Sequence, residues 1–105
     1  MIKVFISQPM KGKTDEEILQ ERKEALEDVK KQLGEEVELL DSFFQGAPSN
    51  VKPLWYLGES LKLLSTADVA YFCKGWAAYR GCRIEYTCAK DYGIEVMEAW
   101  EQTSF

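Results

Sequence analysis

Short apolar segments alternate with amphipathic helical segments along this chain, and the alternation constrains the fold more than any other feature. Four segments rich in apolar and β-branched residues predict strands: IKVFIS (2–7), EVELLDSF (36–43), ADVAYFC (67–73) and IEVMEAW (94–100). Helical patterns fill the intervals between them. Strands joined by helices pair in parallel with right-handed crossovers. The order therefore predicts a small doubly wound α/β domain, a flavodoxin- or Rossmann-like three-layer sandwich with a mostly parallel four- to five-stranded sheet.

Local signals mark the ends of the predicted helices. Thr14 and Glu17 form the S/T-x-x-E capping-box pattern, and Gly34 supplies a stop for the first helix. The second helix starts near Pro53, and the third runs from Arg80 to a stop at Gly93. A chain of 105 residues can bury one modest core, so residues 1–105 are expected to form a single domain.

Composition excludes several classes of function. The sequence has no histidine, which removes Ser-His and Cys-His catalysis. The net charge of -5 argues against a nucleic-acid polymer as partner, because that binding depends on clustered Lys and Arg. Three scattered cysteines do not fit the four-ligand pattern of a zinc site. We therefore expect no metal and no cofactor.

The sequence also predicts a protein of the cytoplasm. No apolar run approaches the roughly 20 residues that span a bilayer, so no membrane partner is expected. The segment MIKVFISQPM has too short an apolar run for a secretory signal and no cleavage-site pattern. The odd number of cysteines is typical of buried thiols in a reducing compartment.

The residues best suited to chemistry follow the predicted strands. In doubly wound sheets ligands bind outside the carboxyl ends of the strands, which here means the loops at 7–13, 41–50 and 74–81. Four aromatic side chains in these loops could stack on a base: Phe43, Phe44, Trp76 and Tyr79. The cations in the same loops would attract a phosphate-bearing ligand, although they could equally be ordinary solvated side chains: Lys11, Lys13, Lys74 and Arg80.

A glutamate interrupts the apolar face of the third helix. At about 100° per residue, Glu85 falls in one arc with Gly81, Ile84, Cys88, Ala89 and Tyr92. An ionised carboxylate costs several kcal/mol in an unpaired apolar site. Three explanations are open: Glu85 projects into a cleft at the strand edge, it caps the helix or pairs with a lysine, or the helical phase is off by one residue.

The motifs together resemble the nucleoside 2-deoxyribosyltransferase superfamily. The stretches ISQPMKGKT, TADVAYFCKGW and GCRIEYTCAKDYG carry the resemblance, which with the element order covers nearly the whole chain. The chain looks closest to a short branch common in phages and Gram-positive bacteria, which implies the host cytoplasm if the protein is phage-encoded.

The resemblance implies roles for individual residues. Glu85 matches the nucleophile that attacks the anomeric carbon, and Asp68 matches the aspartate that binds the nucleoside and handles the base. Tyr79 stands six positions before Glu85, where the transferases usually have an acidic or hydroxyl residue; tyrosine is the weaker general acid near neutral pH. From the motifs and the loop positions we expect these substrate-binding residues: Ser7, Gln8, Pro9, Met10, Gly12, Phe44, Gly75, Trp76, Arg80 and Gly81.

Two functions follow as expectations. The first is cleavage or transfer of the N-glycosidic bond of a nucleoside or nucleotide with Glu85 as nucleophile. The alternative is a non-catalytic protein that sequesters a linear or cyclic nucleotide signal, as a phage anti-defence protein would. A phosphoribohydrolase or another sugar-nucleotide enzyme is a third, weaker possibility. We also expect a homo-oligomer in which the C-terminal segment EAWEQTSF approaches a neighbouring site.

Overall fold

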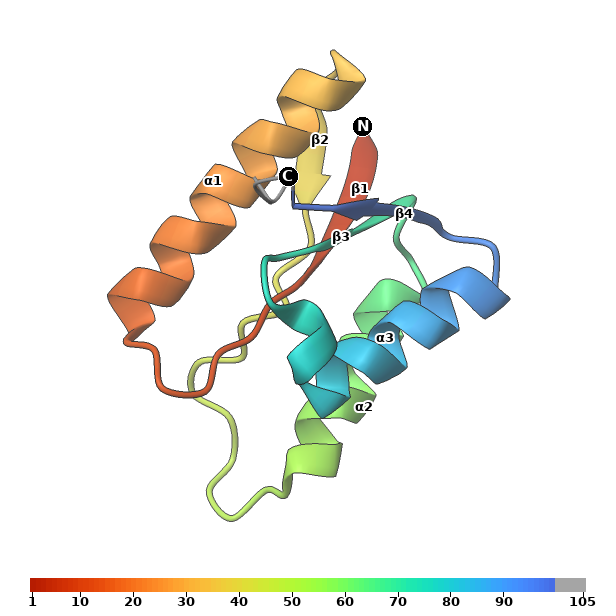
Figure 1. Cartoon of the computed structure of the whole chain (residues 1–105). Helices are drawn as coiled ribbons and strands as arrows, with labels where there is room; N and C mark the ends of the chain where they lie inside the picture. Colours follow the sequence, from red (N-terminus) through yellow and green to blue (C-terminus); the bar gives the residue numbers. More distant parts are fainter. Residues whose placement is uncertain (100–105) are drawn as a thin grey trace.

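The computed structural model describes residues 1–99, which form a four-stranded, all-parallel sheet with helices on both faces (Figure 1). The strand order is β2-β1-β3-β4. The elements in chain order are β1 (Ile2–Ser7), α1 (Asp15–Leu33), β2 (Val37–Leu39), α2 (Pro53–Leu64), β3 (Val69–Phe72), the 3₁₀ turn η1 (Trp76–Ala78), α3 (Arg80–Asp91) and β4 (Glu95–Glu98).

The helices divide between the two faces of the sheet and produce three layers. One core cluster packs Val4 and Ile6 of β1 against Ala25 and Val29 of α1. The other joins Phe5, Ala70 and Phe72 of the sheet to Leu64 of α2 and Ala89 of α3. Because alternate strand residues face opposite ways, β1 contributes to both clusters. These observations confirm the predicted doubly wound three-layer sandwich.

The helix ends follow the local signals. Thr14 accepts from the backbone N–H of Glu17 (3.1 Å), and Glu17 accepts from the backbone N–H of Thr14 (2.9 Å), so the capping box is complete. Gly34 ends α1 with φ of 66°, a left-handed conformation that favours glycine. Acidic residues fill the first turn of α1, where the helix dipole stabilises negative charge.

Three strands are shorter than the sequence pattern predicts. The second was expected over residues 36–43 but covers Val37–Leu39. Leu40 still donates its backbone N–H to Val4 O (2.9 Å), and the chain then leaves the sheet as a loop. The third was expected over 67–73 and covers Val69–Phe72, since Asp68 and Cys73 contribute single backbone bonds at its two ends. The fourth was expected over residues 94–100 and covers Glu95–Glu98.

The inward face of α3 is rotated from the predicted one. Its buried residues are Cys82, Glu85 and Ala89, whereas Ile84 lies at the surface and Tyr92 is 84% exposed. The stripe therefore runs on the Cys82 side of Glu85, and Tyr92 already belongs to the turn that ends the helix. Glu85 lies at the centre of the buried face in both the predicted and the observed orientation of the helix.

Within residues 1–99 none of the helices combines the length and the apolar character needed to cross a bilayer. The expected C-terminal contact with a neighbouring subunit falls mainly on residues 100–105, which lie outside the described residues.

Candidate functional site

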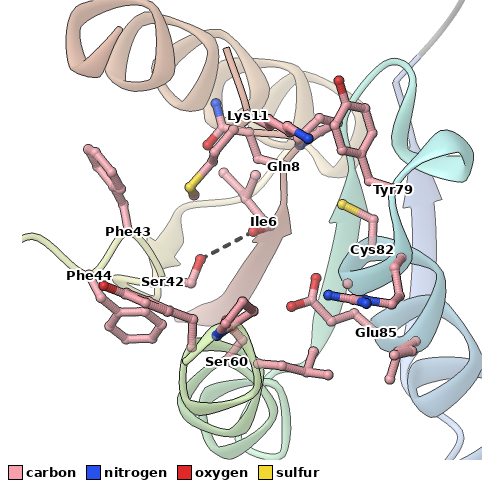
Figure 2. A pocket seen from close by; sticks show the side chains of 18 of the residues that line it. Ile6, Gln8, Lys11, Ser42, Phe43, Phe44, Ser60, Tyr79, Cys82 and Glu85 are labelled. Carbon is pink, nitrogen blue, oxygen red and sulfur yellow. Dashed lines mark hydrogen bonds between the residues drawn. The ribbon is translucent and has the colours of Figure 1, made fainter. Parts of the chain in front are cut away.

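A cavity of about 860 Å³ opens at the carboxyl end of the sheet, and we call it the carboxyl-edge cavity (Figure 2). Three chain segments enclose it: the loop after β1, the loop between β2 and α2 with the first turns of α2, and the first turns of α3. Such a position, at the edge where strand order reverses between β1 and β3, is where doubly wound domains bind ligands.

Glu85 forms part of the inner wall of the cavity. Its side chain extends from α3 toward the middle of the space, with Ser42 and Ser60 on the opposite side (Figure 2). The residue is only 8% exposed. The hydroxyl of Ser7, the last residue of β1, donates a hydrogen bond of 2.6 Å to Glu85 Oε1. One carboxylate oxygen is thereby fixed to the central strand, and the side chain is held in a single direction.

Burial controls the protonation of Glu85. Removal from water penalises the charged form and raises the pKa of this carboxyl to about 7, while the hydroxyls of Ser7 and Ser60 lower the pKa in part. At neutral pH the group is therefore present in both its protonated and its ionised form. A buried carboxyl in a cleft with a pKa near the working pH is typical of functional sites.

Aromatic side chains form much of the opposite wall. Phe43 and Phe44 lie across the cavity from Glu85, and Tyr79 lies above it (Figure 2). Phe44 makes an edge contact with Trp55 of α2, at 6.2 Å between ring centroids, and this contact steadies its position. The wall offers flat apolar surfaces to a ligand in the cavity.

The charges that line the cavity differ in sign from the protein as a whole. Lys11, Lys52 and Arg80 supply three cations, and Glu85 is the one carboxylate among the lining residues. The first turns of α2 and α3 also lie at the cavity, and they carry neither an acidic residue nor a side-chain cap. Their free N–H groups and helix dipoles add positive potential. A chain of net charge -5 thus presents a cavity suited to an anionic group.

Most of the residues predicted from the sequence meet at this cavity. Ser7 stands behind Glu85 and reaches it through the hydrogen bond described above. The predicted residues that line the cavity are Gln8, Pro9, Met10, Phe44, Tyr79, Arg80, Gly81 and Glu85.

Asp68 is the clearest correction. It lies at the opposite, amino edge of the sheet, where its carboxylate accepts from the backbone N–H of Lys3 (2.8 Å) and its own N–H donates to Lys3 O (2.8 Å). Because the strands are parallel, a residue that opens β3 is a full strand length away from residues that follow the strands. Asp68 therefore clamps β1 to β3 and does not contact the cavity.

Gly75 and Trp76 also lie elsewhere. They line a second cavity of about 560 Å³ beside the end of β4, together with Lys74. Trp76 stacks on Tyr86 (4.4 Å between centroids, 16° between planes) and donates its indole N–H to Glu98 Oε1 (3.1 Å). Packing and this hydrogen bond, not a ligand, account for the position of its ring.

Two further loop predictions are corrected. Gly12 has φ of 82° and serves the turn between β1 and α1, outside the lining residues of the carboxyl-edge cavity. Lys13 pairs with Glu21 of α1 at 2.9 Å. Of the four cations expected at this edge, only Lys11 and Arg80 line the cavity, because the other two point to different neighbours.

Sequence reasoning missed several polar residues of the site. Lys52, Ser42 and Ser60 line the cavity, and Arg22 bonds to lining residues from behind. Among these residues the sequence pattern singled out Arg22, because it is a cation on the apolar stripe of the first helix. The serines gave no signal, since a single hydroxyl in a loop or helix is common on any surface.

Comparison with known proteins identifies the family. A family model described as "Domain of unknown function (DUF4406)" matches residues 2–98. The chain belongs to the DUF4406 family. That match covers nearly all of the described domain, including every residue of the carboxyl-edge cavity. The description names no ligand and no reaction. No curated protein and no solved structure matches the chain.

Proposed function

We propose that the carboxyl-edge cavity binds a nucleoside or nucleotide and that Glu85 attacks its anomeric carbon, cleaving or transferring the N-glycosidic bond. The single observation that carries the proposal is the position of Glu85. It is a buried carboxyl that points into a cavity, held there by Ser7, with a pKa raised by burial to about 7.

The shape and the polarity of the cavity support a ligand of this class. Its volume lies within the range of small-molecule sites, roughly 300–1,000 Å³. Phe43, Phe44 and Tyr79 provide faces on which a base can stack. Lys11, Lys52 and Arg80 can neutralise a phosphate, which favours a nucleotide over an uncharged nucleoside.

The reaction balances with groups that the cavity provides. One oxygen of the ionised Glu85 forms a bond to C1′ of the sugar while the C1′–N bond breaks and the base departs with the electron pair. The base takes up a proton, from the Tyr79 hydroxyl or from water. Water, or the nitrogen of a second base, then attacks C1′, gives up a proton to the Tyr79 oxygen or to solvent, and releases the carboxylate. The raised pKa leaves enough ionised Glu85 near neutral pH to start the first step.

A second candidate is a protein that binds the nucleotide without turning it over. Glycosidases commonly place a pair of carboxyl groups around the bond they cleave. Here Glu85 is the one carboxylate that lines the cavity, and Asp68 is at the other edge of the sheet. A cavity with stacking faces and cations but a single carboxylate favours binding alone.

One experiment separates the two candidates. The purified protein is incubated with a panel of ribo- and deoxyribonucleosides and their 5′-monophosphates, and free base is measured by chromatography. The enzymatic proposal predicts base release that Glu85→Gln abolishes and that Glu27→Gln, on the exposed face of α1, leaves unchanged.

Calorimetry on the same panel, extended to cyclic nucleotides, tests the second candidate. Binding without base release would support the binding protein and refute the enzyme. Neither base release nor binding with any member would refute both.

A further inference from the structure

A buried arginine joins the two loops that form the carboxyl-edge cavity. Arg22 lies on the inward stripe of α1 beside Ile18 and Ala25, and it is 3% exposed. Within residues 1–99 no carboxylate lies within ion-pair distance of its guanidinium. Burial accordingly lowers the pKa of Arg22, and the charge of nearby Asp41 opposes this effect. A buried cation without a paired anion is costly, and an apolar residue would suit the stripe.

The hydrogen bonds of Arg22 all go to neutral acceptors at the cavity. One terminal nitrogen donates to Gln8 Oε1 (3.3 Å), in the loop after β1. The other donates to Leu40 O (3.2 Å) and to Ser42 Oγ (3.2 Å), in the loop after β2. Ser42 in turn donates to Ile6 O (3.2 Å), a bond visible in Figure 2. The planar fork of arginine can hold both loops at once.

Gln8 connects this cluster to Glu85. Its amide nitrogen donates to Ile18 O (2.9 Å) and to Glu21 Oε1 (2.8 Å), so its side chain is fixed on the α1 side. The preceding residue, Ser7, ends β1 and donates to Glu85 on the α3 side. Two adjacent residues at the end of β1 therefore hydrogen-bond to two buried ionisable side chains: Ser7 to Glu85 of α3, and Gln8 to Arg22 of α1.

We propose that Arg22 is a positioning residue that holds Gln8 and Ser42 in place and, through the adjoining Ser7, fixes the carboxyl of Glu85. The inference rests on the proposed function for its significance, but its test needs no ligand. Loss of Arg22 would free the loop after β1 and loosen the hydrogen bond from Ser7 to Glu85.

The test measures the pKa of the Glu85 side chain by NMR on protein with ¹³C-labelled glutamate. The Ser7 bond favours the charged form, so loosening it is expected to raise the pKa by about half a unit or more in Arg22→Met and in Gln8→Ala. Arg22→Lys keeps the charge without the fork and should give an intermediate value. Lys23→Met, which removes a cation from the exposed face of α1, should leave the pKa unchanged.

Two outcomes would overturn the inference. One is a wild-type pKa for Glu85 in Gln8→Ala, since that variant breaks the link while keeping Arg22. The other is full restoration by Arg22→Lys, which would show that the charge acts alone. Gln8→Ala keeps the bonds from Arg22 to Leu40 and Ser42, so it remains decisive if the Arg22 variants do not fold. Absence of nucleotide turnover would refute the proposed function and leave this measurement standing.

The other titratable side chains that line the same cavity are unchanged in these variants: Lys11, Lys52, Tyr56, Tyr79, Arg80 and Cys82. Gln8→Ala also leaves the charge of Arg22 in place, so a shift in the pKa of Glu85 in that variant can be assigned to the loops.

Discussion

Replacing Glu85 by glutamine should make the protein more stable at alkaline pH, and the size of the effect follows from burial. In the unfolded chain the pKa of this carboxyl is the ordinary 4.5, and in the folded protein it is about 7. The folded state therefore binds the proton more tightly than the unfolded state does. The stability that this proton contributes is fully present below the unfolded pKa and is lost as the pH rises toward 7. Each unit of pKa difference corresponds to about 1.4 kcal/mol, which gives a total cost of about 3 kcal/mol once the carboxyl is ionised in both states.

The assay is urea unfolding of the wild type and of Glu85→Gln at two pH values. By linkage, Glu85 lowers the free energy of unfolding by about 1 kcal/mol at about pH 5.5 and by about 3 kcal/mol at about pH 8.5. Glutamine has nearly the same shape and does not titrate. The stability difference between the variant and the wild type should therefore grow by about 2 kcal/mol in favour of glutamine between these pH values.

Glu27→Gln provides the matched control, because Glu27 is exposed on α1. Its stability difference from the wild type should change little over the same pH range. A difference for Glu85→Gln that stays constant with pH would refute the argument, since it would mean that Glu85 titrates alike in the folded and unfolded states. A difference that changes in favour of the wild type would mean that the carboxylate is stabilised by the fold.

Three further predictions concern single contacts. Ser7→Ala removes the donor to Glu85 Oε1 and should raise the pKa of Glu85 above about 7, as seen by NMR titration; an unchanged or lower value would contradict the role of this bond. Arg80→Gln should weaken the binding of a nucleoside 5′-monophosphate, measured by calorimetry, by about three- to tenfold, because the lost contact is to phosphate. The affinity for the matching nucleoside should fall less. An equal loss of affinity for both ligands, or the same effect from Arg83→Gln, would argue against a phosphate at this side of the cavity. Thr14→Ala removes the N-cap of α1 and should cost about 1 kcal/mol in urea unfolding; an unchanged midpoint would show that the capping box does not contribute.

The features that the sequence predicted well are local ones. The capping box at Thr14 and the left-handed Gly34 depend on a few neighbouring residues, so their pattern identifies the ends of α1 directly. Glu85 was placed on a buried face by helical periodicity, and an error in the phase of that face did not remove it. The alternation of elements predicted a mostly parallel sheet, and the observed four-stranded sheet is parallel throughout.

The features that it predicted badly depend on distant contacts. The direction of β3 places Asp68 away from the cavity, and packing on Tyr86 does the same for Trp76. Neither effect can be predicted from the residues next to them in the sequence. Arg22 appeared only as an exception on an apolar stripe, because its partners Gln8 and Ser42 are 14 and 20 residues away in the chain. A site assembled from three segments is visible only once those segments are placed.

The segment from Phe43 to Lys52 belongs to no helix or strand, yet it supplies much of the wall that faces Glu85. Its ends are anchored by Ser42 on one side and by the start of α2 on the other. Changes in the length or sequence of this segment could therefore alter which ligands fit, while the core, the sheet and Glu85 stay as they are. Relatives with the same glutamate could in this way diverge in ligand preference by exchanging one surface loop.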